Sequence, residues 1–291
     1  MISSNGALCF LSLVPGSSHT PSQHQLDAHS ALQSQWKRRG VLSAVTISAI
    51  SSIFGTRPCH GISSKQAEDS YDVYASTYDK LDGGKLADSL GIEESRVNLL
   101  SAAKGRCLEI GVGTGLNLSK YIFASSSTAM DGVNSLTLLD ISDGMMAEAR
   151  SKLETLNIPS YVDVKFIKAD ATTELSHLFG DEGYFDTIVD TFSLCVMGNA
   201  GARSCLNQMR NVVKKDTGRI LLIENTRSSN AFLGAYQDLT ADAAAKMGGK
   251  GCVSNQDVSS YIRNTKGLET VSSQDFAAGL FRSYICRRCL D

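Results

Sequence analysis

A turn of three glycines carries the clearest chemistry in the sequence. The stretch LEIGVGTG places Gly111, Gly113 and Gly115 after a short apolar segment, and Glu109 precedes the first glycine by two residues. Glycines in such a turn let the backbone approach a ligand where a β-carbon would collide. A dinucleotide-binding turn has the spacing G-x-G-x-x-G, whereas the spacing here is G-x-G-x-G. A carboxylate at Glu109 would repel a pyrophosphate, so the turn favours a ligand that bears an ammonium group.

Acidic side chains also stand at the ends of the later apolar segments. Asp140 follows LTLL, Asp170 follows IKA, and Asp190 follows TIV. The carboxyl ends of parallel strands meet at one edge of a sheet, where a carboxylate can accept both hydroxyls of a ribose. Each carboxylate alone is more often a helix cap or a solvated loop residue. Their recurrence in register with the glycine turn predicts a single binding edge.

The elements that position these residues alternate along the chain. Strands are expected at 106–110, 135–141, 162–170, 184–194 and 218–225, and helices at 87–105, 115–124, 142–157 and 200–215. Ser142 or Asp143 is expected to cap the third of these helices. The alternation predicts a parallel sheet covered by helices on both faces. The tail over 267–288 is predicted to add two strands, which gives a seven-stranded sheet with a terminal hairpin.

Together these features resemble one family. LEIGVGTG looks like the first motif of the class I S-adenosylmethionine-dependent methyltransferases, and the resemblance covers roughly Ala67 to Arg288. It is closest to the type 11 methyltransferases, and within them to membrane-associated organellar methyltransferase-like proteins, through YDVYASTYDKL, VDTFSLC and GRILLIEN. The resemblance implies an α/β Rossmann-like fold with a mostly parallel seven-stranded sheet, residues 65–291 as the methyltransferase domain, and S-adenosyl-L-methionine as cofactor.

The resemblance also implies roles for individual residues. Asp140 is expected to hold the ribose, and Asp170 with Ala171 the adenine side. Tyr74 and Tyr78 are expected to close over the cofactor, and Asp190, Thr191 and Phe192 to line the cofactor and substrate mouth. The expected cofactor-binding residues are Tyr78, Glu109, Gly111, Gly113, Thr114, Gly115, Asp140, Ile141, Asp170, Ala171, Asp190 and Thr191.

The sequence assigns no catalytic base. Methyl transfer from a sulfonium is an in-line displacement, to which proximity and orientation contribute on the order of 7–11 kcal/mol. A base is needed only where the acceptor must lose a proton. The candidates are Tyr78, His177, Glu224, Asn225 and Tyr236, and His177 is better explained as an exposed helix position. An already activated acceptor of quinol or thiol type fits this pattern, and a protein or another small molecule stays open as acceptor.

Departures from the family pattern lie on the substrate side. IENTRS has Asn225 where the family commonly has histidine, no tryptophan stands near Asn255, and AAGLFRSYI replaces a Gly-Thr turn. A non-catalytic S-adenosylmethionine-binding or assembly protein with the same fold is therefore the alternative, and the turn spacing disfavours an NAD(P)-dependent oxidoreductase. The stretch FLGAYQDLTADAAAKMGG places four apolar residues on one helical face, either as core or as a lid over an apolar acceptor. They are Phe232, Leu233, Tyr236 and Leu239.

The first 64 residues differ from the rest. They hold fourteen serines and four of the five histidines, and Asp27 is their only acidic residue. This composition is typical of an organellar targeting segment. Arg38 and Arg39 precede an apolar run over Val41 to Gly55, which resembles a thylakoid or twin-arginine signal and is shorter than the roughly 20 residues of a membrane span. We expect 1–64 to be a presequence, removed or disordered, that directs the protein to a plastid, with thylakoid association open; a mitochondrion is the alternative. A short membrane anchor is the weaker interpretation of the apolar run.

The remaining chain limits the partners. Residues 65–291 have 24 Lys and Arg against 29 Asp and Glu, a net charge of −5, which argues against nucleic acid and leaves a small-molecule acceptor, with peripheral membrane association open. His177 is the one histidine of this part, so a histidine triad or a two-histidine zinc site is excluded and no metal is expected. The close cysteine pair in CRRC, Cys286 and Cys289, is interpreted as structural or incidental, with a redox or metal role as the alternative.

Overall fold

The computed structural model describes residues 61–82, 85–246 and 251–289. These residues belong to the compact unit Cys59–Asp291. The predicted presequence, its removal and its targeting signal fall on residues 1–64, so almost all of that prediction lies outside the described residues.

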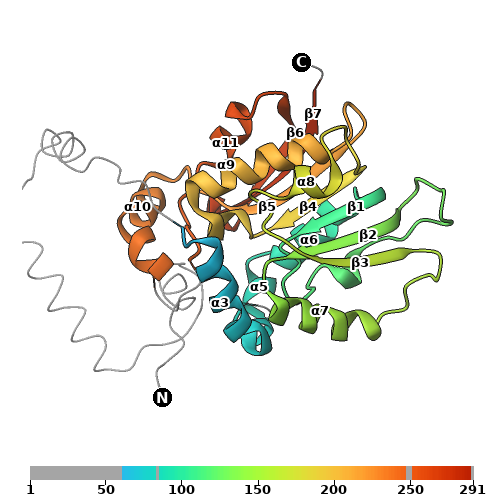
Figure 1. Cartoon of the computed structure of the whole chain (residues 1–291). Coiled ribbons are helices and arrows are strands. Elements are labelled where there is room, and N and C mark those ends of the chain that lie inside the picture. Colours follow the sequence, from blue (N-terminus) through green and yellow to red (C-terminus); the bar gives the residue numbers. More distant parts are fainter. Residues whose placement is uncertain (1–60, 83–84, 247–250, 290–291) are drawn as a thin grey trace, which may run out of the picture. The chain divides into compact units, whose positions relative to one another are not determined.

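A mixed sheet of seven strands forms the centre of this unit (Figure 1). Its order is β3-β2-β1-β4-β5-β7-β6. The first five strands pair in parallel, and β7 pairs antiparallel with both β5 and β6. The predicted Rossmann-like sheet with its terminal hairpin is confirmed. The strands are β1 Gly105–Ile110, β2 Val133–Asp140, β3 Asp163–Lys168, β4 Thr187–Thr191, β5 Arg219–Asn225, β6 Leu268–Phe276 and β7 Phe281–Arg288.

The central strands are apolar on both faces because each face has its own hydrophobic core. In β5, Ile220 and Leu222 pack into one core, whereas Leu221 and Ile223 pack into the other. This alternation follows from the two-residue repeat of a strand. The two cores fix the register of β5, and therefore the place where the strand ends at the site.

Helices cover both faces (Figure 1). Residues of α8, α9 and α11 complete the first core, and residues of α6 and α7 complete the second. Ser142 caps α7 by accepting a hydrogen bond from the backbone N–H of Met145 at 3.1 Å, as the sequence predicts. The α-helices are α3 Ser64–Tyr74, α4 Tyr78–Asp82, α5 Lys85–Ser89, α6 Ile92–Leu100, α7 Asp143–Glu154, α8 Leu175–Phe179, α9 Leu194–Val212, α10 Ala231–Lys246 and α11 Val258–Asn264.

Two predicted helices are wrong in extent. The helix expected at 115–124 is reduced to the single 3₁₀ turn η3, Leu118–Lys120. Beyond it the chain becomes extended and bonds to the start of β2, where Val133 exchanges backbone hydrogen bonds with Ile122 and Ala124 at 2.9 and 3.0 Å. The helix expected at 87–105 is divided into α5 and α6 at Gly91, whose φ of 73° is left-handed.

Half of the predicted apolar face of α10 is exposed to solvent. Phe232 is 90% exposed and Leu239 is 84% exposed. Instead, the buried amide of Gln237 holds the helix, donating to the carbonyls of Thr226 and Ser254 at 3.0 and 2.7 Å. The core interpretation is therefore wrong for Phe232 and Leu239, whereas Leu233 and Tyr236 are half-buried. Within the described segments, no helix is long and apolar enough to cross a membrane.

Candidate functional site

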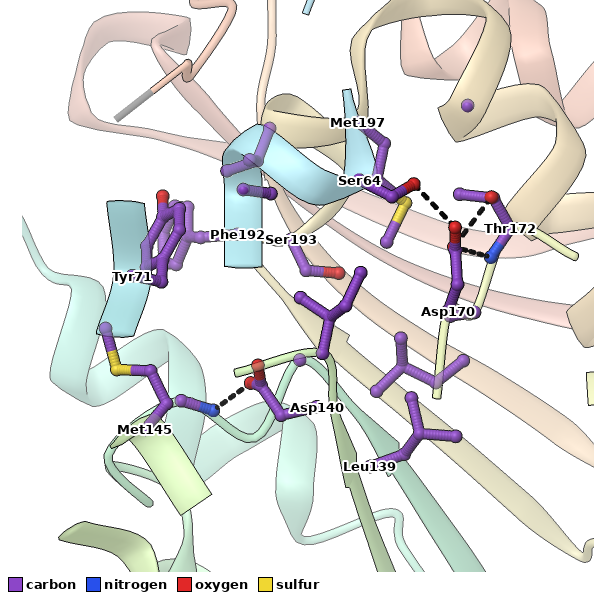
Figure 2. Close-up of a pocket in the computed structure, with 18 of the residues that line it drawn as sticks. Ser64, Tyr71, Leu139, Asp140, Met145, Asp170, Thr172, Phe192, Ser193 and Met197 are labelled. Atoms are coloured by element: carbon purple, nitrogen blue, oxygen red, sulfur yellow. Dashed lines mark hydrogen bonds between the residues drawn. The ribbon is translucent and has the colours of Figure 1, made fainter. Parts of the chain in front are cut away.

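A cavity of about 390 Å³ opens at the carboxyl ends of β1, β2 and β4 (Figure 2). It lies between the glycine turn and helix α3. Open parallel sheets bind ligands at this edge. Of the residues expected from the sequence, those that line it are Tyr78, Gly111, Gly113, Asp140, Ile141, Asp170, Ala171 and Thr191.

The glycine turn needs its glycines for two different reasons. Gly111 and Gly113 have φ of 62° and 55°, in the left-handed region where other residues are strained. A β-carbon on Gly111 would lie 2.6 Å from the Cβ of Ser193, so close packing also requires glycine there. A β-carbon on Gly113 would have no neighbour closer than 3.9 Å. Since Gly113 lines the cavity, that free space is available to a ligand.

Asp140 joins the second strand to the glycine turn. Its Oδ2 accepts the backbone N–H of Gly113 at 2.8 Å (Figure 2), and its Oδ1 accepts that of Ser142 at 2.9 Å. Burial raises the pKa of Asp140, and these backbone donors act against that shift. A carboxylate has about four acceptor sites. Asp140 therefore keeps capacity for a ligand hydroxyl while the backbone fixes its orientation.

Asp170 stands at the other end of the cavity. Its Oδ1 accepts the backbone N–H and the hydroxyl of Thr172 at 2.8 and 2.7 Å. Its Oδ2 accepts the hydroxyl of Ser64 at 2.5 Å, which ties α3 to the sheet edge (Figure 2). Ala171 is buried beside it. The edge thus presents two carboxylates, at Asp140 and Asp170, separated by apolar side chains.

Four of the expected residues do not line the cavity. Glu109 lies buried beneath the turn, where Asn117 and Tyr121 donate to it at 3.0 and 2.8 Å. Burial raises the pKa of Glu109 to about 7. The Thr114 hydroxyl donates to Asp79 at 2.5 Å. Gly115 and Asp190 are the other two expected residues that do not line the cavity. The sequence predicts that all four lie at this edge of the sheet, but it does not reveal which side chains point into the cavity.

Asp190 forms a buried pair with Glu224 below the cavity. Asp190 accepts the backbone N–H and the hydroxyl of Ser193 at 3.1 and 2.6 Å. Glu224 accepts the backbone N–H of Leu194 at 3.1 Å. Burial raises the pKa of Asp190 to about 6, and burial followed by the charge of Asp190 raises the pKa of Glu224. The pair therefore holds a proton more tightly than exposed carboxyls do, and it fixes the start of α9 to the sheet.

Helix α3 supplies the wall that the sequence analysis located least well. Ser64, Ala67 and Tyr71 line the cavity with Tyr78. Tyr74, which was expected to close over the ligand, is absent from the lining and instead packs edge-on against Tyr71, with ring centroids 6.4 Å apart. The helical spacing of the three tyrosines in YDVYASTY was the available signal.

The apolar end of the cavity is built by the chain after β4. Phe192, Val196 and Met197 line it, with Ile62 preceding α3. Phe192 has a φ of 67°, which makes a sharp turn between β4 and α9. Only Phe192 of these was expected at the mouth. The others lie in loops or first helical turns, where the sequence pattern carries little information.

The candidate bases are mostly outside the cavity. Of the five, only Tyr78 lines it. His177 is exposed on α8, as expected, and Glu224 is buried. The amide of Asn225 donates to the sulfur of Cys252 at 3.0 Å. No cluster of three or more His, Cys, Asp or Glu side chains suited to a metal occurs among the described residues.

Comparisons with known proteins agree with this geometry. A family model described as a methyltransferase domain matches residues 107–216. The mitochondrial methyltransferase OMS1 of Saccharomyces cerevisiae is 28% identical over 75% of this chain and 45% of its own length. The ubiquinone/menaquinone biosynthesis C-methyltransferase UbiE of Azotobacter vinelandii is 29% identical over 61% of this chain and 66% of its own length. The chain thus spans less than two thirds of the first protein and just under two thirds of the second.

A solved structure shares the fold. The N-methyltransferase NodS from Bradyrhizobium japonicum, in complex with S-adenosyl-L-homocysteine, aligns with a TM-score of 0.52 and 16% identity. The alignment covers 77% of this chain and 98% of NodS.

Proposed function

Because the chain belongs to the class I S-adenosylmethionine-dependent methyltransferases, we propose that it transfers a methyl group to a small apolar acceptor at this cavity. The observation that carries the proposal is the pairing of Gly113 with Asp140. The backbone N–H of Gly113 orients the carboxylate, and the missing β-carbon of Gly113 leaves space beside it. The carboxylate can accept the two hydroxyls of a ribose, and the free space at Gly113 lets the rest of the ligand lie close to the backbone.

The residues present fit the cofactor of this class. Asp140 would hold the ribose hydroxyls, and Asp170 with Ala171 the adenine. The glycine turn and Tyr78 would face the methionine portion. Glu109, Thr114, Gly115 and Asp190 would act from beneath by fixing the turn and the start of α9. Ile141 and Thr191 complete the expected contacts, and all of these assignments remain predictions that binding measurements can check.

Bound S-adenosylmethionine supplies a methyl group on a sulfonium, which any adequate nucleophile placed in line can accept. The protein's part is to position the acceptor and to exclude water. Phe192, Val196 and Met197 offer an apolar surface for that purpose. Positive charge leaves the sulfur during the transfer, and it is either neutralised by an anionic acceptor or released from a neutral one as a proton.

A quinol-type ring is the acceptor we favour. A ring carbon made electron-rich by its hydroxyls can attack the methyl carbon without prior deprotonation, and the sulfonium then departs as a neutral thioether. The methylated ring carbon afterwards releases its proton to water, or to Tyr78, the one candidate base that lines the cavity. The bacterial relative UbiE is named as a C-methyltransferase of ubiquinone and menaquinone biosynthesis, which supports this acceptor class. A thiol is the competing acceptor, because a thiolate also needs no base in the site.

We further propose a mitochondrial location. The yeast relative OMS1 is named as a mitochondrial methyltransferase, which supports the mitochondrial alternative. A fluorescent protein fused after Asp291 of the full chain would be imaged against mitochondrial and plastid markers in a plant or algal cell. Plastid fluorescence alone would refute this location.

The test of the activity is methyl release. Purified full chain is incubated with radiolabelled S-adenosylmethionine and, separately, a demethylated quinol kept reduced and a small aliphatic thiol. We expect label in the quinol, and much less with Asp140→Ala. Label in the thiol alone would refute the acceptor class, while binding of S-adenosylhomocysteine without any transfer, to these acceptors or to a cell extract, would favour the non-catalytic alternative.

A further inference from the structure

Two cysteines from distant parts of the sequence meet beside the cavity. Cys195 stands in the first turn of α9, and Cys252 follows α10 in the segment that leads to α11. Their sulfur atoms are 2.6 Å apart, although 57 positions separate the residues. Two neighbouring contacts hold the approach in place. The N–H of Val253 donates to the carbonyl of Cys195 at 2.9 Å, and Asn225 donates to the Cys252 sulfur.

The two thiols differ in access. Cys195 is buried, and both its hydrogen bond with Cys252 and its burial raise the pKa of its thiol. Cys252 is only partly buried. An oxidant in solution therefore reaches Cys252 first, and the buried thiol is placed to attack second. Cys107, Cys205 and Cys286 are buried in the hydrophobic cores, so they serve as controls for the oxidation of Cys195 and Cys252.

We propose that Cys195 and Cys252 form a reversible dithiol–disulfide site, oxidised by exchange with a small disulfide such as oxidised glutathione. The Cys252 thiolate attacks one glutathione sulfur, breaks the glutathione disulfide and releases one glutathione. Cys195 then gives its proton to water and attacks the Cys252 sulfur, releasing the second glutathione. The protein loses two protons and two electrons, and one glutathione disulfide takes up the same number to become two thiols.

The position of this site connects it to the cavity wall. Phe192, Ser193, Val196 and Met197, which flank Cys195 in sequence, line the cavity. On the other side, Gly251 packs directly on Ile62, a further lining residue. A disulfide would therefore tie the segment that begins at Gly251 covalently to the start of α9. The same bond would close a loop that includes β5 and α10, which should raise resistance to unfolding.

Peptide mapping tests the proposal without any methyl acceptor, so it can fail independently of the proposed activity. Trypsin cleaves after Lys168, Arg203, Lys250 and Arg263, which leaves the two cysteines in separate peptides with no other cysteine. The reduced full chain is incubated with oxidised glutathione, free thiols are alkylated, and the digest is analysed without reduction. We expect the two peptides joined, and separated again by dithiothreitol. Alkylated Cys195 beside a persistent glutathione adduct on Cys252 would overturn the proposal.

Matched variants sharpen the result. Cys195→Ser should retain glutathione on Cys252, whereas Cys286→Ser should form the same linked peptides as the parent. Oxidised parent protein should unfold at a higher denaturant concentration than the reduced form, and Cys252→Ser should show no such difference. Equal behaviour of parent and Cys252→Ser would count against the bond. Circular dichroism checks that each variant folds. If a variant fails to fold, peptide mapping of the parent protein still tests the proposal.

Discussion

The two walls of the cavity are built in different ways. The sheet wall consists of strand ends and the glycine turn, and its carboxylate Asp140 is buried and held by backbone N–H groups. The α3 wall has no buried residue within the helix. It is attached to the sheet edge through side chains, including Ser64 on Asp170 and Glu68 on Lys168, the latter at 2.7 Å.

This difference separates recognition from access. Buried backbone contacts keep one geometry, whereas exposed polar contacts exchange readily with water and contribute little each. The sheet wall is therefore preorganised for the ligand. The α3 wall can open to admit the ligand and close again at small cost. Variants of the two walls should consequently differ in kind: sheet-wall variants should change affinity, and α3 variants should change rates.

The largest effect is expected at Gly113. In Gly113→Val the side chain would occupy the free space beside Asp140, and φ of 55° would strain the residue. We expect no detectable binding of S-adenosylhomocysteine by isothermal titration calorimetry. Gly91→Val is the matched control, because Gly91 also has a left-handed φ, 73°, with no atom within 4 Å of the added β-carbon. Full binding by Gly113→Val would remove the turn from the site.

Asp140→Ala should weaken binding without preventing it. A hydrogen bond to a charged group contributes roughly 1.5–3 kcal/mol, so the dissociation constant of S-adenosylhomocysteine should rise about 10- to 150-fold. Asp163→Ala is the control, because Asp163 is exposed at the opposite end of its strand and pairs with Lys165. The same calorimetric titration measures both variants. An unchanged dissociation constant for Asp140→Ala would exclude this carboxylate from ribose binding.

The contrast between the walls also explains what the sequence could predict. Strand ends such as Asp140 and the glycine spacing are local patterns, so the sheet wall is largely visible in the sequence. The α3 wall depends on where a separate helix packs, which is why Tyr71 was missed and Tyr74 was misplaced. The expected helix after Gly115 failed for a similar reason. Its helical pattern is local, but the chain's pairing with Val133 is a tertiary interaction.

The buried wall should also make stability depend on pH. The pKa of Glu109 is raised from 4.5 to about 7, chiefly by burial. Between these values the folded protein binds a proton that the unfolded chain has released, so stability is full below pH 4.5 and falls as the pH rises to about 7. Asp190 and Glu224 act in the same direction.

Glu109→Gln isolates this contribution. Between about pH 4.5 and pH 7 the parent should lose on the order of 2 kcal/mol of unfolding free energy relative to the variant, measured by urea denaturation at each pH. The groups that face Glu109 are Asn117, Tyr121, Arg96 and Asp190. Glu154→Gln, at an exposed position of α7, serves as control, and its unfolding free energy should depend on pH as that of the parent does. Parallel curves for Glu109→Gln and the parent would show that Glu109 does not titrate in this range.

The smallest effect on affinity is expected from the α3 wall. Glu68→Gln removes the ion pairs of half-buried Glu68 with Lys168 and Lys65, and Lys168 also contacts Asp143 at 2.6 Å. Exposed pairs contribute little, so the dissociation constant of S-adenosylhomocysteine should change less than about fivefold. The helix should nevertheless open more often, and stopped-flow displacement should show faster release of S-adenosylhomocysteine.

Salt dependence tests the same ion pair. Because salt screens exposed charges, raising the ionic strength should speed release from the parent more than from Glu68→Gln. Glu148→Gln, exposed on α7, should behave as the parent. If Glu68→Gln instead weakened binding as much as Asp140→Ala, α3 would be part of recognition, and the distinction between the walls would fail.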